Sequence, residues 1–174
     1  MASPIIYKLV ARPHKRPYIL SGALPVEYWK DHFNGYPLPA NWQPPAHTVH
    51  GTTYALSDAI AWKEPLPLLS ARAVELLEKI AHGCAEYRYF CHIKDEPYYV
   101  LNVLAEADPA AHSLSPPLFK RPGQFASDTL CTASVPAAIV DRRLTGFCFR
   151  DPLPSETRAL FLGKDTNVYP GVLA

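Results

Sequence analysis

The longest apolar run in the chain lies within residues 97–108, where Asn102 is a polar interruption between aromatic and β-branched residues. Such a run is typical of a central strand that is buried on both faces. Residues 85–93, with the sequence AEYRYFCHI, also favour a strand. Because only residues 94–96 separate the two segments, the pattern predicts an antiparallel hairpin.

A three-residue turn fixes the expected register of this hairpin. It places Cys91 opposite Tyr99, and it puts Tyr89 and Tyr87 on the same apolar face. Three-residue turns usually have glycine in a left-handed conformation. The turn contains no glycine, and we therefore expect Asp95 to adopt that conformation.

The clearest helical pattern covers residues 70–82. Apolar residues recur there at helical spacing and form one broad face, whereas charged residues form the other. Ser70 is expected to cap the N-terminus, and Gly83 is expected to end the helix. We expect the apolar face, with Leu77 near its centre, to pack on the hairpin.

A second helix is predicted at about residues 135–144, with Ser134 as its cap and Gly146 as its stop. The remaining β-like segments are residues 4–11, 48–54, 57–62, 129–133 and 147–149. Together these elements predict an α+β fold in which two principal helices pack on a mostly antiparallel sheet.

Proline marks the connections. The chain has 19 prolines among 174 residues, which is about twice the ordinary usage of roughly 5%. Residues 12–46 are interpreted as an irregular arm rich in aromatics and prolines, with one or two helical turns near residues 26–33. Residues 109–127 are predicted to be a long loop. A Pro-containing tail is expected over 151–174, and residues 1–174 are expected to form a single domain.

Composition narrows the functional classes. A net charge of +1 argues against nucleic-acid binding, which needs several uncompensated cations on one face. Residues 1–20 contain no long apolar block, and no run approaches the roughly 20 residues of a membrane span. Four cysteines without a CxxC pair favour reduced thiols. We therefore expect a cytoplasmic protein.

Two sets of residues suggest possible chemistry. His47 and His50 have a spacing seen in zinc sites, but no HExxH motif or cysteine pair accompanies them. Cys84 or Cys91, with His92 as base, suggests a thiol nucleophile, although a free cysteine is more often a small core hydrophobe. We expect no metal site, no cofactor and no catalytic residue.

The aromatic residues of the arm allow two interpretations. They are either anchors of a protein interface, where Trp and Tyr are enriched, or they pack the arm on the sheet. The candidate anchors are Trp29, Phe33, Tyr36 and Trp42.

Helix caps, glycine stops and apolar strands over residues 55–150 resemble a bacterial family of predicted immunity proteins from polymorphic toxin systems. Asp58 and Trp62 resemble an acidic and aromatic patch of the same family. The other residues that carry the resemblance are Ser70, Gly83, Tyr98, Tyr99, Asn102, Asp108, Ser134, Thr145, Gly146 and Phe149.

The resemblance implies a protein that is not an enzyme and that neutralises a cognate toxin by stoichiometric protein–protein binding. Two alternatives stay open at this point. One is a small cysteine-dependent hydrolase, and the other is a scaffold or interaction module with the same fold and no toxin.

Overall fold

The computed structural model describes residues 5–12, 19–21, 26–50, 56–61, 66–110, 116–124 and 128–150. The predicted tail at 151–174 and Trp62 lie outside these ranges.

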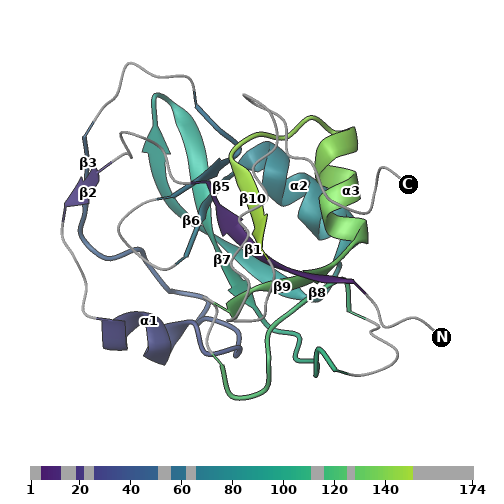
Figure 1. The fold of residues 1–174 in the computed structure, drawn as a ribbon. Helices are drawn as coiled ribbons and strands as arrows, with labels where there is room; N and C mark the ends of the chain where they lie inside the picture. Colours follow the sequence, from purple (N-terminus) through teal and green to yellow (C-terminus); the bar gives the residue numbers. More distant parts are fainter. Residues whose placement is uncertain are drawn as a thin grey trace.

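Within the described ranges the strands form two antiparallel four-stranded sheets and one two-stranded sheet (Figure 1). The first sheet, in spatial order, consists of β10 (Phe147–Arg150), β1 (Ile6–Ala11), β9 (Leu130–Thr132) and β8 (Leu118–Phe119). The second consists of β4 (Ala59–Ile60), β5 (Leu68–Ser70), β7 (Glu96–Val103) and β6 (Ala85–Ile93). The smallest pairs β2 (Ile19–Ser21) with β3 (Thr48–His50).

Three helices complete this part of the chain, and the α+β prediction is confirmed. Figure 1 shows two of them side by side and the third apart from them. The helices are α1 (Val26–His32), α2 (Ala71–Ile80) and α3 (Ser134–Asp141). No helix of the described residues is long and apolar enough to cross a membrane.

Strand β7 is the central buried strand that the apolar run predicts. It lies between β5 and β6, and Val100, Leu101 and Val103 have no exposed surface. Leu101 and Val103 belong to the main core, which also contains the apolar faces of α2 and α3. Val100 faces a second core, which contains the aromatic residues of α1. Both faces of β7 are therefore covered, which explains its almost continuous apolar sequence.

The hairpin exists, but its predicted register is wrong. Only Lys94 and Asp95 form the turn, and both have positive φ angles, of 49° and 68°. This is the backbone of the two-residue turn that matches strand twist. This shorter turn places Cys91 opposite Tyr98 rather than Tyr99, and a bulge between Tyr89 and Cys91 then places Tyr89 opposite Tyr99.

The bulge also corrects the prediction of which residues face the core. Phe90 and Cys91 both pack in the second core, whereas Tyr89 is exposed. A bulge places two residues opposite one, and it therefore breaks the strict alternation that the sequence argument assumes.

Helix α2 begins as predicted. The Ala73 amide donates to Ser70 Oγ at 3.2 Å, and Leu77 is fully buried. The helix ends at Ile80, and Gly83, with φ of +73°, lies in the turn that leads to β6. That turn needs the conformational freedom of glycine.

The predicted ends of α3 need correction. Ser134 does not cap it, because Ala133 holds the cap position and no side chain accepts a hydrogen bond there. At the other end Arg143, with φ of 52°, takes the left-handed position that ends the helix, and Gly146 lies three residues further along the chain. The Leu144 amide donates to the Ile139 carbonyl and the Arg143 amide to that of Val140, which is a Schellman ending.

The described part of the arm packs on the second sheet. Helix α1 is confirmed, and Trp29 on it and Phe33 directly after it are fully buried. Their rings lie 5.3 Å apart, and Trp29 also approaches Phe90 of β6. The second core therefore closes the face of the second sheet opposite to α2. Its other buried members are Leu38, Ile60, Leu66, Leu68, Cys91, Ile93, Tyr98 and Val100.

Backbone hydrogen bonds join the two large sheets at two places. At the first junction the Ala59 amide donates to the Thr145 carbonyl at 3.0 Å. At the second, Lys120 follows β8 and exchanges 3.0 Å bonds with Ala105 and Ala107, which follow β7. Strand β8 lies where residues 109–127 were predicted to be loop, and two-residue strands carry little periodic signal.

The contribution of the α2 apolar face is testable at Leu77. Leu77→Asp should abolish cooperative folding, because it buries a charge without a partner. Leu77→Ala should lower the free energy of unfolding by about 2–5 kcal/mol. Chemical denaturation measures both, with exposed Val140→Ala as control, expected within about 0.5 kcal/mol of wild type. A Leu77→Asp variant with an unchanged Tm would contradict this core.

Candidate functional site

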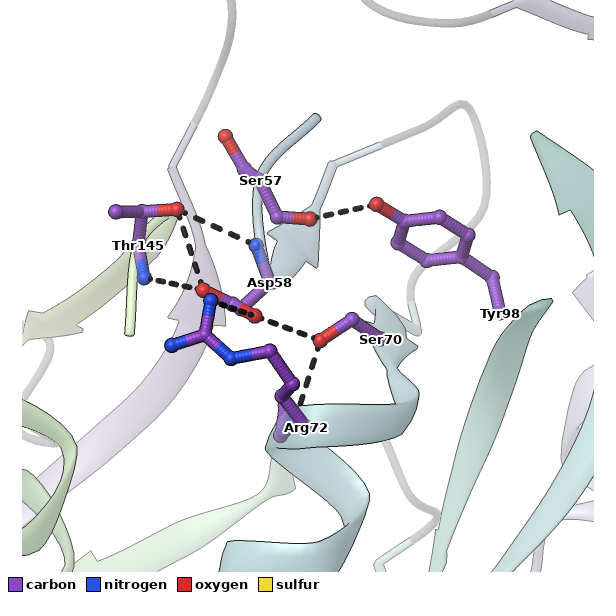
Figure 2. A network of polar contacts seen from close by, with 7 residues as sticks. Ser57, Asp58, Ser70, Arg72, Tyr98 and Thr145 are labelled. Carbon is purple, nitrogen blue, oxygen red and sulfur yellow. Dashed lines mark hydrogen bonds and ion pairs between the residues drawn. The ribbon is translucent and has the colours of Figure 1, made fainter. Parts of the chain in front are cut away.

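A buried carboxylate lies at the first sheet junction (Figure 2). Asp58 Oδ1 accepts a hydrogen bond from Ser70 Oγ at 2.8 Å, and Oδ2 accepts one from the Thr145 amide at 2.9 Å. The Ser70 amide donates to the Asp58 carbonyl at 2.8 Å. Asp58 therefore connects the N-terminus of α2 to the segment that precedes β10.

Two further residues of the resemblance meet at the same junction. The Tyr98 hydroxyl donates to the Ser57 carbonyl at 2.8 Å, as Figure 2 shows. Gly146 has φ of +83°, and a β-carbon there would lie 2.1 Å from the Ala59 carbonyl oxygen. Only glycine permits this close approach of the two chains.

The chemistry of this cluster is structural. The partners of the Asp58 carboxylate are a Ser hydroxyl, a Thr residue and the Arg72 guanidinium, whose Nη1 lies 3.8 Å from Oδ1. Ser70 Oγ, which donates to the Asp58 carboxylate, also accepts a hydrogen bond from the Ala73 amide and thereby caps α2. The cluster therefore positions strands and a helix.

Other residues of the resemblance also have structural contacts. Asp108 Oδ1 accepts from the Ala110 amide at 2.9 Å, which is the turn that its position before Pro109 predicts. Phe149 stacks on Phe147 in the main core. Tyr99 packs edge-on against Tyr89.

The cysteines give no support to a thiol nucleophile. All four are buried, and burial raises the pKa of Cys91 to about 11. Burial also raises the pKa of Cys131. The His92 ring is exposed, with Nδ1 2.8 Å from the Tyr89 hydroxyl. A nucleophilic cysteine needs a lowered pKa and access, and Cys91 has neither.

Of the two histidines whose spacing suggested a zinc site, the structure describes the side chain of His47 only. His47 donates from Nδ1 to the Pro45 carbonyl at 2.7 Å, and its ring stacks on Phe90. The side chain of His50 lies outside the described residues. Among those that are described, no group of three or more metal-ligating side chains is assembled.

The four candidate anchors of the arm separate into different environments. Trp29 and Phe33 are fully buried in the second core, which favours for both the interpretation that they pack the arm on the sheet. Trp42 is half-buried and packs edge-on against Phe33. Tyr36 is 75% exposed, and it is the only one of these four residues with an exposed side chain.

Tyr36 stands beside a cleft with a volume of about 780 Å³. The cleft lies between the end of the arm helix and the chain segments of the second sheet junction. Its lining residues are Lys30, Asn34, Gly35, Tyr36, Leu104, Glu106, Gly123 and Gln124.

The backbone around Tyr36 is held by three hydrogen bonds. The Tyr36 amide donates to Asn34 Oδ1 at 3.1 Å, and Asn34 Nδ2 donates to the Asp31 carbonyl at 3.0 Å. Asn102 Nδ2 donates to the Tyr36 carbonyl at 2.8 Å. An exposed ring is therefore carried on a fixed loop, and Asn102, the polar interruption in β7, is the residue that fixes it.

Below the same loop lies a buried cation. Lys120 has no exposed surface, and its ammonium pairs with Glu106 on the wall of the cleft. Gly35, with φ of +96°, rests on it, and a β-carbon there would lie 2.3 Å from Lys120 Cε. The hydrogen bond from Lys120 holds the pKa of Glu106 below its ordinary value.

Sequence reasoning missed the roles of Gly35, Lys120 and Glu106. The end of α1 near Asn34 was the one available signal, because it predicted where the helix stops. Nothing in the sequence relates that turn to Lys120, which lies 85 residues further along the chain.

No protein-family model matches this chain, and a search of the curated proteins finds no matching sequence.

The Asp58 junction predicts a large loss of stability in Asp58→Ala. Each buried donor left without its acceptor costs about 1–3 kcal/mol, and this variant affects Ser70 and Thr145. We therefore expect the free energy of unfolding to fall by about 3 kcal/mol. Asp141→Ala, on an exposed turn of α3, should change it by less than about 0.5 kcal/mol. Equal denaturation curves for the two variants would refute this role for Asp58.

Gly35 and Gly123 form a matched pair on the cleft, since both have positive φ angles. A β-carbon at Gly123 meets nothing within 4 Å, whereas one at Gly35 meets the Lys120 side chain. Gly123→Ala should cost about 1–2 kcal/mol from backbone conformation alone. Gly35→Ala should cost more, because Lys120 must also move. If thermal unfolding gave the opposite order, the packing of Gly35 on Lys120 would be wrong.

Proposed function

We propose that this chain is a bacterial immunity protein that binds a cognate toxin stoichiometrically and neutralises it. The observation that carries the proposal is the 75% exposed ring of Tyr36, which stands on a fixed loop beside a large cleft. The resemblance over residues 55–150 supplies the class of partner.

A fixed exposed aromatic suits protein binding for an energetic reason. Tyr is enriched among the residues that dominate interface energies. Binding also costs less when the contact loop is already ordered, because less conformational entropy is lost. The hydrogen bonds of Asn34 and Asn102 to the Tyr36 backbone provide this order.

The partner proposed is a toxin protein in the cytoplasm, and the mode is coverage of its active site or locking of its fold. The chain has a net charge of +1. A highly basic toxin would be best complemented by an acidic inhibitor, and a less basic partner is therefore favoured. The proposed activity needs no catalytic residue.

The first experiment is co-purification with the product of the adjacent upstream gene, followed by a toxicity-rescue test in cells. A stable complex with rescue supports immunity. A complex without rescue favours a scaffold, and the absence of both contradicts the proposal.

The proposed anchor is tested by Tyr36→Ala. If Tyr36 dominates the interface, its removal should weaken toxin binding by about 2 kcal/mol, or about 30-fold in Kd. The free energy of unfolding should stay within about 0.5 kcal/mol of wild type, because the ring is exposed. Calorimetric titration measures Kd, and chemical denaturation measures stability.

Tyr89→Ala, which removes another exposed tyrosine ring, is the matched control and should leave Kd unchanged. Trp29→Ala should instead lower stability, by about 3–5 kcal/mol. An unchanged Kd in Tyr36→Ala would remove Tyr36 from the interface.

A further inference from the structure

The loop that carries Tyr36 is attached to the second sheet through the two residues that follow the ring. Pro37 has no amide hydrogen to donate, and Leu38 is buried in the second core. The Leu38 amide donates to Glu86 Oε1, and the Leu38 carbonyl accepts from Arg88 Nη2 at 2.8 Å. Both polar backbone groups of Leu38 are therefore held by side chains of β6.

Glu86 is the centre of this attachment. Asn102, its neighbour across the hairpin, donates from Nδ2 to Glu86 Oε1 and to the Tyr36 carbonyl, each at 2.8 Å. Arg88 Nε donates to Glu86 Oε2 at 3.1 Å. One carboxylate therefore connects the side chains that hold the Tyr36 carbonyl and the Leu38 carbonyl. We call Glu86, Arg88 and Asn102 the loop clamp.

The loop clamp is largely shielded from water. Asn102 has no exposed surface, and the side chains of Glu86 and Arg88 are 17% and 31% exposed. Polar groups in such surroundings are costly unless they are bonded, which favours one arrangement of the three side chains. Hydrogen bonds are also directional, and they therefore fix the loop more narrowly than the apolar contacts of Leu38 alone would.

We propose that Glu86 and Arg88 are positioning residues of the partner site, which hold the free loop in the conformation in which Tyr36 binds. The inference rests on the proposed function. The two residues act through the loop backbone, whereas the Tyr36 ring is the anchor. When only a fraction of the free molecules has the competent loop, the apparent Kd rises in inverse proportion to that fraction. Loss of the clamp therefore weakens binding even though the ring is still present.

The clamp is tested first in the free full-length chain, by amide hydrogen exchange measured with NMR. Glu86→Ala should speed exchange of the Tyr36 amide about fivefold or more, although that amide bonds to Asn34 and not to Glu86. Glu96→Ala, which removes an exposed carboxylate at the other end of the hairpin, should change it by less than about twofold. Unchanged exchange in Glu86→Ala would overturn the proposal. The absence of any complex with the wild-type chain would instead contradict the proposed function only.

Binding kinetics with the purified product of the adjacent upstream gene separate positioning from contact. Glu86→Ala should raise Kd about fivefold, mainly through slower association, because fewer free molecules have the competent loop. Tyr36→Ala removes a contact and should mainly speed dissociation. Glu86→Gln keeps an oxygen that accepts from Leu38 and Asn102, and it should bind within about twofold of wild type. A Glu86→Ala variant in which only the dissociation rate changed would overturn the assignment.

A double-mutant cycle shows whether the clamp acts through Tyr36. If it does, Glu86→Ala in the Tyr36→Ala background should change Kd by less than about twofold, because the anchor is already absent. A full, additive effect in that background would mean that Glu86 only stabilises the chain, and it would overturn the proposal. Arg88→Gln, which removes the donor to the Leu38 carbonyl, replaces the glutamate variant in all three measurements if that variant does not fold.

Discussion

The Asp58 carboxylate is the contact on which most of the architecture depends. A buried carboxylate is costly unless its oxygens are paired, and here Ser70 Oγ and the Thr145 amide each donate to one oxygen. The same contacts set three features of the fold: the start of α2, the edge strand β4 and the entry into β10. Removal of the Asp58 carboxylate would leave two donors unpaired, the Ser70 hydroxyl at the start of α2 and the Thr145 amide before β10.

The second sheet junction also contains a buried charge, but this one faces a cleft. Lys120 lies wholly inside and pairs with Glu106 on the cleft wall. Gly35 rests on the lysine stem, and Asn102 holds the carbonyl of the next residue. The stability of the sheet junction and the position of the Tyr36 ring therefore depend on the same few contacts, which links the fold to the proposed interface.

The placement of the helices separates the cleft beside Tyr36 from the main core. Helix α1 covers one face of the second sheet and leads into the cleft beside Tyr36. Helices α2 and α3 share the main core on the other face of β7. Sequence reasoning included Tyr36 among four candidate anchors, but it had no means to separate Tyr36 from Trp29. Both are aromatic residues in a Pro-rich segment, and only packing decides which ring is buried.

Local patterns in the sequence determined the α+β class, the buried strand β7, the hairpin and the Ser70 cap of α2. Each of these depends on residues within a few positions of one another. The tertiary structure alone decided the bulge in β6, the Schellman ending of α3 at Arg143, and the split into two sheets. It also brought Asp58 to Thr145 and Gly35 to Lys120, across 87 and 85 residues. Such contacts depend on how the elements pack against one another, and no local periodicity of apolar residues specifies that packing.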